Sequence, residues 1–221
     1  MGLEFELPEG ATPITPDEAG GLIPSIATQS ELNTFEAINI VEAANWAIGN
    51  KRFLRTLLSD DGLRRLHKRM FNRTWKWAGV YRLTQTSIGV EAYRISMEVR
   101  NLIADVKCWL EFSSYPPAEI AARFHHRLVE IHPFVNGNGR HARLATDLLC
   151  EFQCWPISKW GAANLVQDGE IRRRYIQALK SADRRDYVPL IEFMDLRFPE
   201  KSSETVVLSK ADTQIRLKYE A

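Results

Sequence analysis

Several features that would assign this 221-residue sequence to a special class of protein are absent from it. No apolar run is long enough to cross a bilayer, and the acidic, proline-containing start lacks the basic-then-apolar order of a signal peptide. The three cysteines, Cys108, Cys150 and Cys154, cannot all pair, which favours a reducing compartment. Lys and Arg total 29 against 28 acidic residues, so net charge gives no basis for general attraction to nucleic acid or membranes. These absences predict a cytoplasmic protein.

Residues of β-favouring composition are also scarce and fall in one stretch, 83–95. Ile88, Val90 and Tyr93 favour a strand, and Gly89 is available for a turn. A single hairpin cannot form a sheet core, so we expect it to pack on helices and to offer an open edge to an extended peptide. The alternative is a passive surface hairpin.

Apolar side chains at helical spacing account for most of the remaining sequence, which predicts a mainly α-helical protein. Residues 1–24 hold four prolines and four glycines and indicate an extended arm. A capping box at Thr28–Glu31 begins a helix that reaches Ile48. We therefore divide the chain into an arm and first helix (1–49), a domain (50–198) and a tail (199–221) without an assigned structure.

The expected helices have definite starts and inward-facing positions. Caps are expected at Ser59 and Ser96, the following helix starts at Pro116-Pro117, another runs from about Arg140 to Phe152, and two shorter helices come later. Inward positions include Leu32, Phe35, Ile38, Trp46, Leu63, Leu66, His67, Met70, Phe71, Val99, Leu102, Ile103, Val106, Phe124, Leu128, Ala142, Ala145, Leu148, Leu149, Phe152, Tyr175, Leu190 and Met194. For His67 we expect a hydrogen-bonded core histidine, with a ligand role as the alternative.

The stretch from Ile131 to Arg143, IHPFVNGNGRHAR, carries the chemistry. Pro133 forces the chain out of a helix at His132, and a glycine-containing turn then leads into a new helix. The start of a helix exposes backbone N–H groups that bind anions, and Arg140 and Arg143 share a helix face. His132 is the side chain whose ordinary pKa lies near neutrality. The pattern predicts a phosphate cradle with a base beside it.

These residues resemble the signature of the Fic family, H-P-F-x-[D/E]-G-N-G-R-x-x-R, at every position except Asn136. The segment 66–82, LHKRMFNRTWKWAGVYR, is also similar, and the resemblance covers about residues 50–198. It implies a Fic-type helical bundle with one β-hairpin flap. The arm, first helix and NGNGRHAR variant further resemble the mobile mystery protein B subgroup, which implies a link to mobile elements and a helix-turn-helix partner protein encoded alongside.

The resemblance implies a nucleotidyltransferase that moves AMP, or another nucleoside monophosphate, from a nucleoside triphosphate such as ATP to a Ser, Thr or Tyr hydroxyl of a target protein. His132 would be the general base. The nucleotide-binding residues would be Phe134, which anchors the loop in the core, and Gly137, Asn138, Gly139, Arg140 and Arg143. The flap, with Ile88, Gly89, Val90 and Tyr93, would dock the target protein.

Asn136 stands where the family has an acidic residue that binds Mg²⁺. An amide oxygen can coordinate Mg²⁺ or Mn²⁺ but brings no negative charge, and hard cations favour carboxylates. We therefore expect weaker metal binding and slower turnover, or a changed preference for metal or nucleotide.

Many Fic proteins are restrained by a glutamate in an [S/T]-x-x-x-E-[G/N] motif that pairs with the second signature arginine, here Arg143. No stretch of this sequence matches that motif; Glu31 and Glu36 come nearest. Glu31 is already used in the capping box, so we do not expect an internal inhibitor, and inhibition by a partner protein is the alternative. Greatly increased activity in a Glu36→Gly variant would contradict this expectation.

Two other hypotheses compete with the transferase, and a metal site is also considered. A related branch that transfers phosphate has lysine in place of Gly139, so Gly139 favours nucleotide transfer. A catalytically weak Fic scaffold that binds nucleotide or a partner, in a toxin–antitoxin-like pair, is supported by Asn136. A histidine metal site built from His125, His126 and His141 with His132 is not expected, because adjacent histidines on a helix point about 100° apart.

Overall fold

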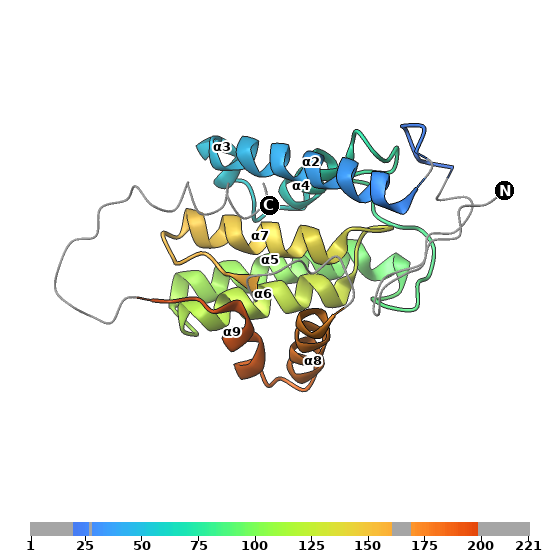
Figure 1. Ribbon diagram of the computed structural model, residues 1–221. Helices are drawn as coiled ribbons and strands as arrows, with labels where there is room; N and C mark the ends of the chain where they lie inside the picture. Colours follow the sequence, from blue (N-terminus) through green and yellow to red (C-terminus); the bar gives the residue numbers. More distant parts are fainter. Residues whose placement is uncertain (1–19, 27, 161–168, 199–221) are drawn as a thin grey trace.

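The computed structural model describes residues 20–26, 28–160 and 169–198, and within these ranges the fold is helical without a β-strand (Figure 1). The helices are α2 (Gln29–Ile48), α3 (Lys51–Leu54), α4 (Asp60–Phe71), the 3₁₀ helix η1 (Ala92–Arg94), α5 (Ile95–Phe112), α6 (Pro117–Ile131), α7 (Asn138–Phe152), α8 (Glu170–Asp183) and α9 (Val188–Met194). Most of the predicted arm and the whole predicted tail lie outside the described residues. Among the described helices, none has the length and apolar character needed to cross a membrane.

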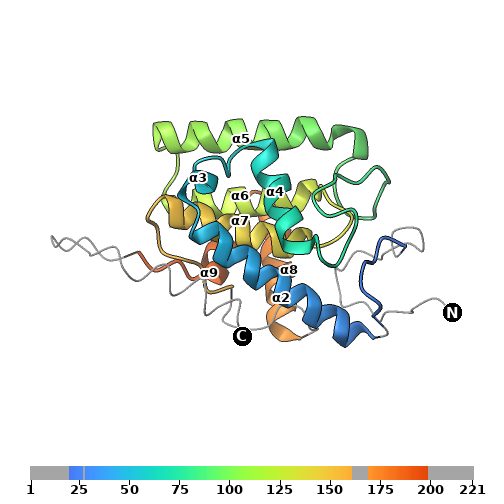
Figure 2. The ribbon, with the colours of Figure 1, turned by 90° about the horizontal axis from the view of Figure 1, so that it is seen from above.

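Helices α6 and α7 form the centre of the fold. In Figure 1, α2, α3 and α4 cover one side of this pair, and α8 and α9 lie on the opposite side. Figure 2 shows α5 along one edge and α2 crossing over α7. Helix α7 is buried almost along its length, including Ala142, Ala145, Leu148 and Leu149 as predicted. The loop that joins α6 to α7 is therefore held between two rigid, buried helices.

The predicted helices and several caps are confirmed. Ser59 accepts a hydrogen bond from the Gly62 N–H at 2.9 Å, and the capping box of Thr28 and Glu31 is present. The predicted cap at Ser96 is wrong, because α5 begins one residue earlier, at Ile95, directly after η1. The predicted inward stripe of α4 is buried: Leu63, Leu66, His67, Met70 and Phe71.

The predicted inward face of α2 is partly wrong. Phe35 and Ile38 are 45% and 53% exposed, whereas Glu36 and Asn39 are buried. Asn39 donates to the Thr74 hydroxyl at 2.8 Å, so a partner on another element explains its burial. Phe152, at the end of α7, is also exposed rather than inward. The sequence prediction chose Phe35 and Ile38 because they are hydrophobic. The adjacent polar residues are buried instead, because each has a hydrogen-bonding partner that is distant in the sequence.

The predicted hairpin at 83–95 is not formed. The segment is irregular up to Glu91 and then enters η1. The carbonyls of Thr84 and Val90 accept hydrogen bonds from the Arg82 guanidinium, and the Val90 N–H donates to the Ile131 carbonyl at 3.3 Å. Backbone groups that would pair across a hairpin are therefore bound by a buried side chain and by the end of α6.

Candidate active site

Two residues with a left-handed backbone conformation determine the path of the loop between α6 and α7. Helix α6 ends at Ile131, and its cap residue His132 has φ 52° and ψ 59°; Gly137, with φ 77°, precedes α7. Asn138 closes the loop: the Phe134 N–H donates to its Oδ1 at 2.9 Å, and its Nδ2 donates to the Phe134 carbonyl at 2.8 Å. The Asn138 side chain is thus a buried clamp, and only its backbone can contribute to the predicted anion cradle.

Phe134 anchors this loop from below. Its ring is fully buried and stacks on His67 with centroids 3.7 Å apart and planes 17° apart. A Cβ on Gly137 would lie 2.5 Å from the Phe71 ring, so the chain approaches the aromatic floor too closely for any other residue. Phe134 was predicted both to anchor the loop and to be among the nucleotide-binding residues; its complete burial supports only the anchoring role.

His67 is the hydrogen-bonded core histidine that the sequence favoured. Its Nδ1 accepts from the Gly79 N–H at 2.9 Å, and its Nε2 lies 3.0 Å from the Asn136 carbonyl oxygen. Burial, the largest effect, lowers the pKa of His67 well below 6.5, so the imidazole is neutral. The sequence did not indicate that one of its partners would belong to the loop.

His132 is nearly buried, at 7% exposure, and its Nδ1 lies 3.3 Å from the Val129 carbonyl oxygen. A carbonyl can only accept, so the proton of the neutral ring is on Nδ1, and Nε2 is the basic nitrogen. Burial lowers the pKa of His132 to about 4, with a smaller lowering effect from Arg82 and an opposing effect from the Val129 hydrogen bond. The predicted base is therefore neutral throughout the physiological pH range.

Arg82, which the sequence analysis did not single out, holds the segment above His132. Arg82 is 1% exposed, and its Nε donates to the His132 carbonyl at 2.8 Å. Burial lowers the pKa of Arg82 from its ordinary value. The backbone at Gly89 passes so close that an added Cβ would lie 2.6 Å from the His132 Cβ. Arg82 ends the segment that resembles the family, and that position was the only signal for its role.

The predicted target-docking residues differ in exposure. Tyr93 is 84% exposed and Ile88 is 37% exposed, while Val90 is half-buried against the core. Leu83, which was not predicted, is 90% exposed. This segment therefore presents apolar side chains to the solvent next to the base.

The two signature arginines have different partners. Arg140 Nη1 lies 2.5 Å from Glu36 Oε2, and Nη2 lies 3.3 Å from Asn136 Oδ1. Glu36 is 4% exposed, and its other oxygen accepts from Trp75 Nε1 at 2.7 Å. The predicted phosphate-binding group thus already holds a carboxylate of the same chain.

Arg143 extends toward α8 instead. Its guanidinium lies 5.8 Å from the centre of the Tyr175 ring, and its Nη1 is 3.8 Å from where a Cβ of Gly139 would stand. The Tyr175 hydroxyl lies 2.8 Å from His125 Nε2. Burial raises the pKa of Tyr175, whereas the neighbouring Arg143 opposes this increase. Arg143 therefore lies over the loop and faces a neutral phenol.

The surroundings of Asn136 do not fit a Mg²⁺ site formed by the protein. Its Oδ1 accepts a hydrogen bond from the Gly137 N–H and faces the Arg140 guanidinium, so donors already surround the oxygen that the signature position would offer to the metal. Mg²⁺ in nucleotide enzymes is held by carboxylates together with substrate phosphates. In the described part of the chain, no group of three or more His, Cys, Asp and Glu side chains is arranged to bind a metal.

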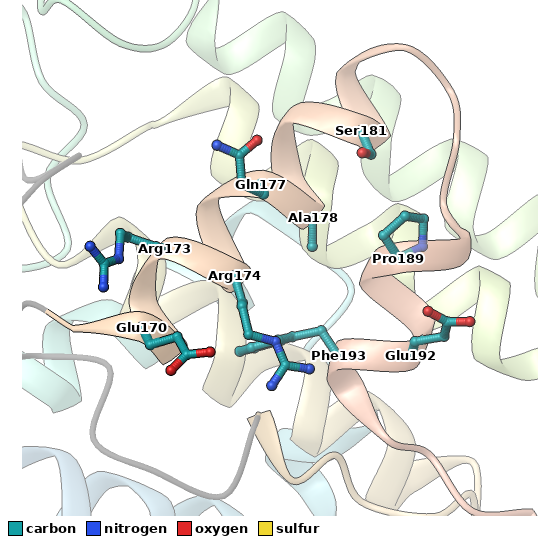
Figure 3. A pocket seen from close by; sticks show the side chains of 9 residues that line it. All are labelled: Glu170, Arg173, Arg174, Gln177, Ala178, Ser181, Pro189, Glu192 and Phe193. Carbon is teal, nitrogen blue, oxygen red and sulfur yellow. The ribbon is translucent and has the colours of Figure 1, made fainter.

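The other histidines are bound separately. His126 contacts Asp183 at 2.8 Å, and His141 contacts the Leu63 carbonyl at 2.9 Å. A hollow of about 360 Å³ between α8 and α9 contains none of the predicted site residues. Figure 3 shows the charged side chains of Glu170, Arg174 and Glu192 around it.

Known proteins resemble this chain in sequence. The Fic/DOC family model matches residues 57–150, which include α4 and the whole loop. Protein adenylyltransferase fic-1 of Caenorhabditis briggsae is 30% identical over 141 residues, which cover 62% of this chain and 26% of that protein. Protein adenylyltransferase Fic of Drosophila grimshawi is 29% identical over 119 residues, 52% of this chain and 23% of that protein. The chain thus spans about a quarter of the length of these relatives.

Solved structures share the fold. The N-terminal FIC domain of Bep8 from Bartonella sp. 1-1C superposes with a TM-score of 0.64 at 17% identity, over 81% of this chain and 91% of that one. BepC of Bartonella tribocorum, solved with bound AMPPNP, gives a TM-score of 0.62 at 19% identity, over 88% of this chain and 97% of that one.

Proposed function

We propose that this chain, which belongs to the Fic/DOC family, transfers AMP or another nucleoside monophosphate from a nucleoside triphosphate to a Ser, Thr or Tyr hydroxyl of a target protein. The observation that carries the proposal is the position of a buried, neutral His132 at the start of a loop that leads into the N-terminus of α7. The adenylyltransferase names of the relatives support the choice of AMP.

The reaction that fits this site is an in-line displacement at the α-phosphorus. The target hydroxyl oxygen forms a bond to the α-phosphorus, and the bond from that phosphorus to the oxygen bridging to the β-phosphate breaks, so pyrophosphate leaves. The hydroxyl proton passes to Nε2 of His132, which is unprotonated while Nδ1 donates to Val129. Because its pKa is low, His132 accepts this proton as the new bond forms and the hydroxyl becomes acidic.

Charge stabilisation would come from fixed donors. The backbone N–H groups of Gly137, Asn138 and Gly139 stand at the first turn of α7, where anions bind favourably. Arg140 and Arg143 would hold the outer phosphates. Since the residues around Asn136 do not fit a metal site, the steps described above involve no metal, and the Mg²⁺ or Mn²⁺ expected from the resemblance would have to be held largely by the nucleotide phosphates.

We further propose that Glu36 competes with the nucleotide. Its carboxylate binds the same guanidinium that an outer phosphate would use, so a nucleotide has to displace it from Arg140. This differs from the family motif described above, because the partner is the first signature arginine. This proposal of an internal inhibitor departs from the expectation drawn from the sequence, and the Glu36–Arg140 ion pair supports it.

The remaining assignments are proposals that rest on the resemblance. The target protein would dock on the segment with Ile88, Gly89, Val90 and Tyr93, which needs no pre-formed hairpin, because an extended peptide can order an irregular segment on binding. A helix-turn-helix partner and a mobile-element origin are proposed from the subgroup resemblance, a toxin–antitoxin-like pairing belongs to the scaffold alternative, and a cytoplasmic location is proposed from the sequence composition. The weak-scaffold alternative has less support, since His132, the glycine loop and both signature arginines are present in the sequence and the relatives are named adenylyltransferases.

The decisive experiment is transfer of label from α-labelled ATP into the chain itself and into a lysate, with Mg²⁺ or Mn²⁺. Wild type should give labelled protein, and His132→Ala should give none while still binding ATP. Binding of ATP without His132-dependent label under either metal would contradict the transferase and support the scaffold.

A further inference from the structure

We infer that His67 is a positioning residue for the anion cradle: by binding the Asn136 carbonyl, it turns the Gly137 N–H toward the phosphate site. His67 lies on α4, 69 residues before Asn136 and outside the signature. The inference rests on the proposed function, because the phosphate of the nucleotide is the anion that the turned N–H would bind.

The hydrogen-bond partners of His67 determine which of its two ring nitrogens carries the proton. The Gly79 N–H can only donate, so Nδ1 accepts and carries no proton. The Asn136 carbonyl oxygen can only accept, so Nε2 carries the proton and donates to it. A neutral imidazole satisfies both partners at once, and burial keeps it neutral.

The peptide group after Asn136 transmits this constraint. No cis peptide bond occurs in the described residues, so the Asn136 carbonyl and the Gly137 N–H point in opposite directions across one planar unit. With the carbonyl directed at buried His67, the N–H is directed away from the core. There it donates to Asn136 Oδ1, the same oxygen that faces Arg140. An oxygen of this chain thus occupies the point between the N–H and the guanidinium where a phosphate oxygen would bind.

Packing fixes the imidazole in this orientation. His67 is fully buried, stacks on Phe134 at 3.7 Å and lies 4.7 Å from the Phe71 ring. Phe71 also touches the site at Gly137, where no Cβ fits. One aromatic layer therefore supports the loop from below, and His67 is the member of that layer that binds the loop backbone at Asn136.

Two substitutions separate the hydrogen bonds of His67. His67→Gln places an amide N–H near the position of Nε2 and keeps a donor for Asn136, but it loses the acceptor for Gly79. His67→Asn places its amide oxygen near Nδ1 and keeps the acceptor for Gly79, but it does not reach Asn136. Each variant loses one buried hydrogen bond, so similar decreases in melting temperature are expected and make the two a matched pair.

The probe is inorganic pyrophosphate, measured by calorimetry on the full chain. His67→Asn should weaken its binding by about tenfold, the effect of one misdirected donor, whereas His67→Gln should remain within about twofold of wild type. Equal weakening in both variants, or greater weakening in His67→Gln, would overturn the inference and leave His67 a residue of the core only.

A second measurement does not depend on how well the variants fold. The ¹⁵N–¹H resonance of Gly137 in the wild-type chain should shift when pyrophosphate is added, and an unmoved resonance would overturn the inference. These two measurements also distinguish the positioning role of His67 from the proposed transfer reaction. If Gly137 shifts and the variants differ as expected but no AMP is transferred, the proposed reaction fails and the positioning role stands. If both variants transfer AMP like wild type, only the positioning role fails.

Discussion

The carboxylate of Glu36 and the guanidinium of Arg140 form a largely buried ion pair between residues that are 104 positions apart. Glu36 comes from α2 and Arg140 from the first turns of α7, so the pair joins a helix on the outside of the fold to the loop of the site. One of the two arginines that the sequence predicted to bind phosphate is therefore already paired with a carboxylate in the folded chain.

Replacing Glu36 by Gln should strengthen nucleotide binding. The amide oxygen still accepts from Trp75, while the charge that competes for Arg140 is removed. We expect ATP to bind about tenfold more tightly by calorimetry and label transfer to increase in parallel. Glu42→Gln is the matched control, because Glu42 lies on the same helix in an exposed pair with Arg73. Unchanged ATP affinity in Glu36→Gln would contradict the competition.

Replacing His132 by Ala should abolish transfer without abolishing binding, because only proton removal is lost. The transfer rate should decrease by roughly 10²- to 10⁴-fold, with the ATP dissociation constant nearly unchanged. His126→Gln serves as the control histidine, since His126 lies on α6, which His132 directly follows, but binds Asp183 instead. Equal loss of activity in both variants would point to a general defect of α6.

The stability of the fold should decrease as the pH falls from about 6.5 toward 4. His132 and His141 each have a pKa lowered to about 4 in the fold, mainly by burial, against about 6.5 when unfolded. Between these values the unfolded chain binds more protons, so protonation favours unfolding. Each histidine should remove about 2 kcal/mol from the free energy of unfolding between pH 7.5 and pH 5. Urea denaturation at both pH values tests this, and His132→Ala should flatten the dependence.

Asn136→Asp should increase the dependence of transfer on Mg²⁺. A carboxylate adds a negative charge and a preferred ligand type at the one position where the family signature has an acid. The Mg²⁺ concentration for half-maximal transfer should decrease about fivefold, because a charged ligand binds the cation more tightly than a neutral amide does. Asn136→Ala is the control for loss of the amide oxygen, and an Asp variant that responds to Mg²⁺ like wild type would count against this reading.

Arg82→Lys should loosen the segment above His132. The guanidinium reaches the carbonyls of His132, Thr84 and Val90 in three directions, which a single ammonium cannot reproduce. Amide hydrogen exchange in residues 83–91 should become about tenfold faster, the effect of losing roughly one buried hydrogen bond. The exposed Arg73→Lys change should leave this exchange unaltered, and protection retained in Arg82→Lys would show that Arg82 does not hold the segment.

Local signals in the sequence predicted much of the fold. The capping box at Thr28, the cap at Ser59 and the proline at the start of α6 act within one turn of chain, so their effect can be read without knowing the rest. The same holds for the loop that begins at His132 and turns at Gly137, because backbone preference at proline and glycine is local.

The failures occurred where a distant partner decides the outcome. The segment 83–95 has strand-favouring side chains, but the buried Arg82 guanidinium binds its carbonyls, and no local pattern reveals that. On α2 the sequence favoured Phe35 and Ile38 as buried, whereas Glu36 is buried because Trp75 and Arg140 bind it.

By itself, the sequence determined a helical protein with a histidine, a glycine loop and two arginines in the order of a phosphate-binding signature. Only the tertiary structure decided the protonation and the partners of those groups. It determined which ring nitrogen of His132 is basic, which carboxylate forms an ion pair with Arg140, and which buried histidine binds the Asn136 carbonyl. The physical reason is that backbone turns depend on neighbouring residues, whereas pKa values and hydrogen-bond directions depend on burial and on partners that only folding brings together.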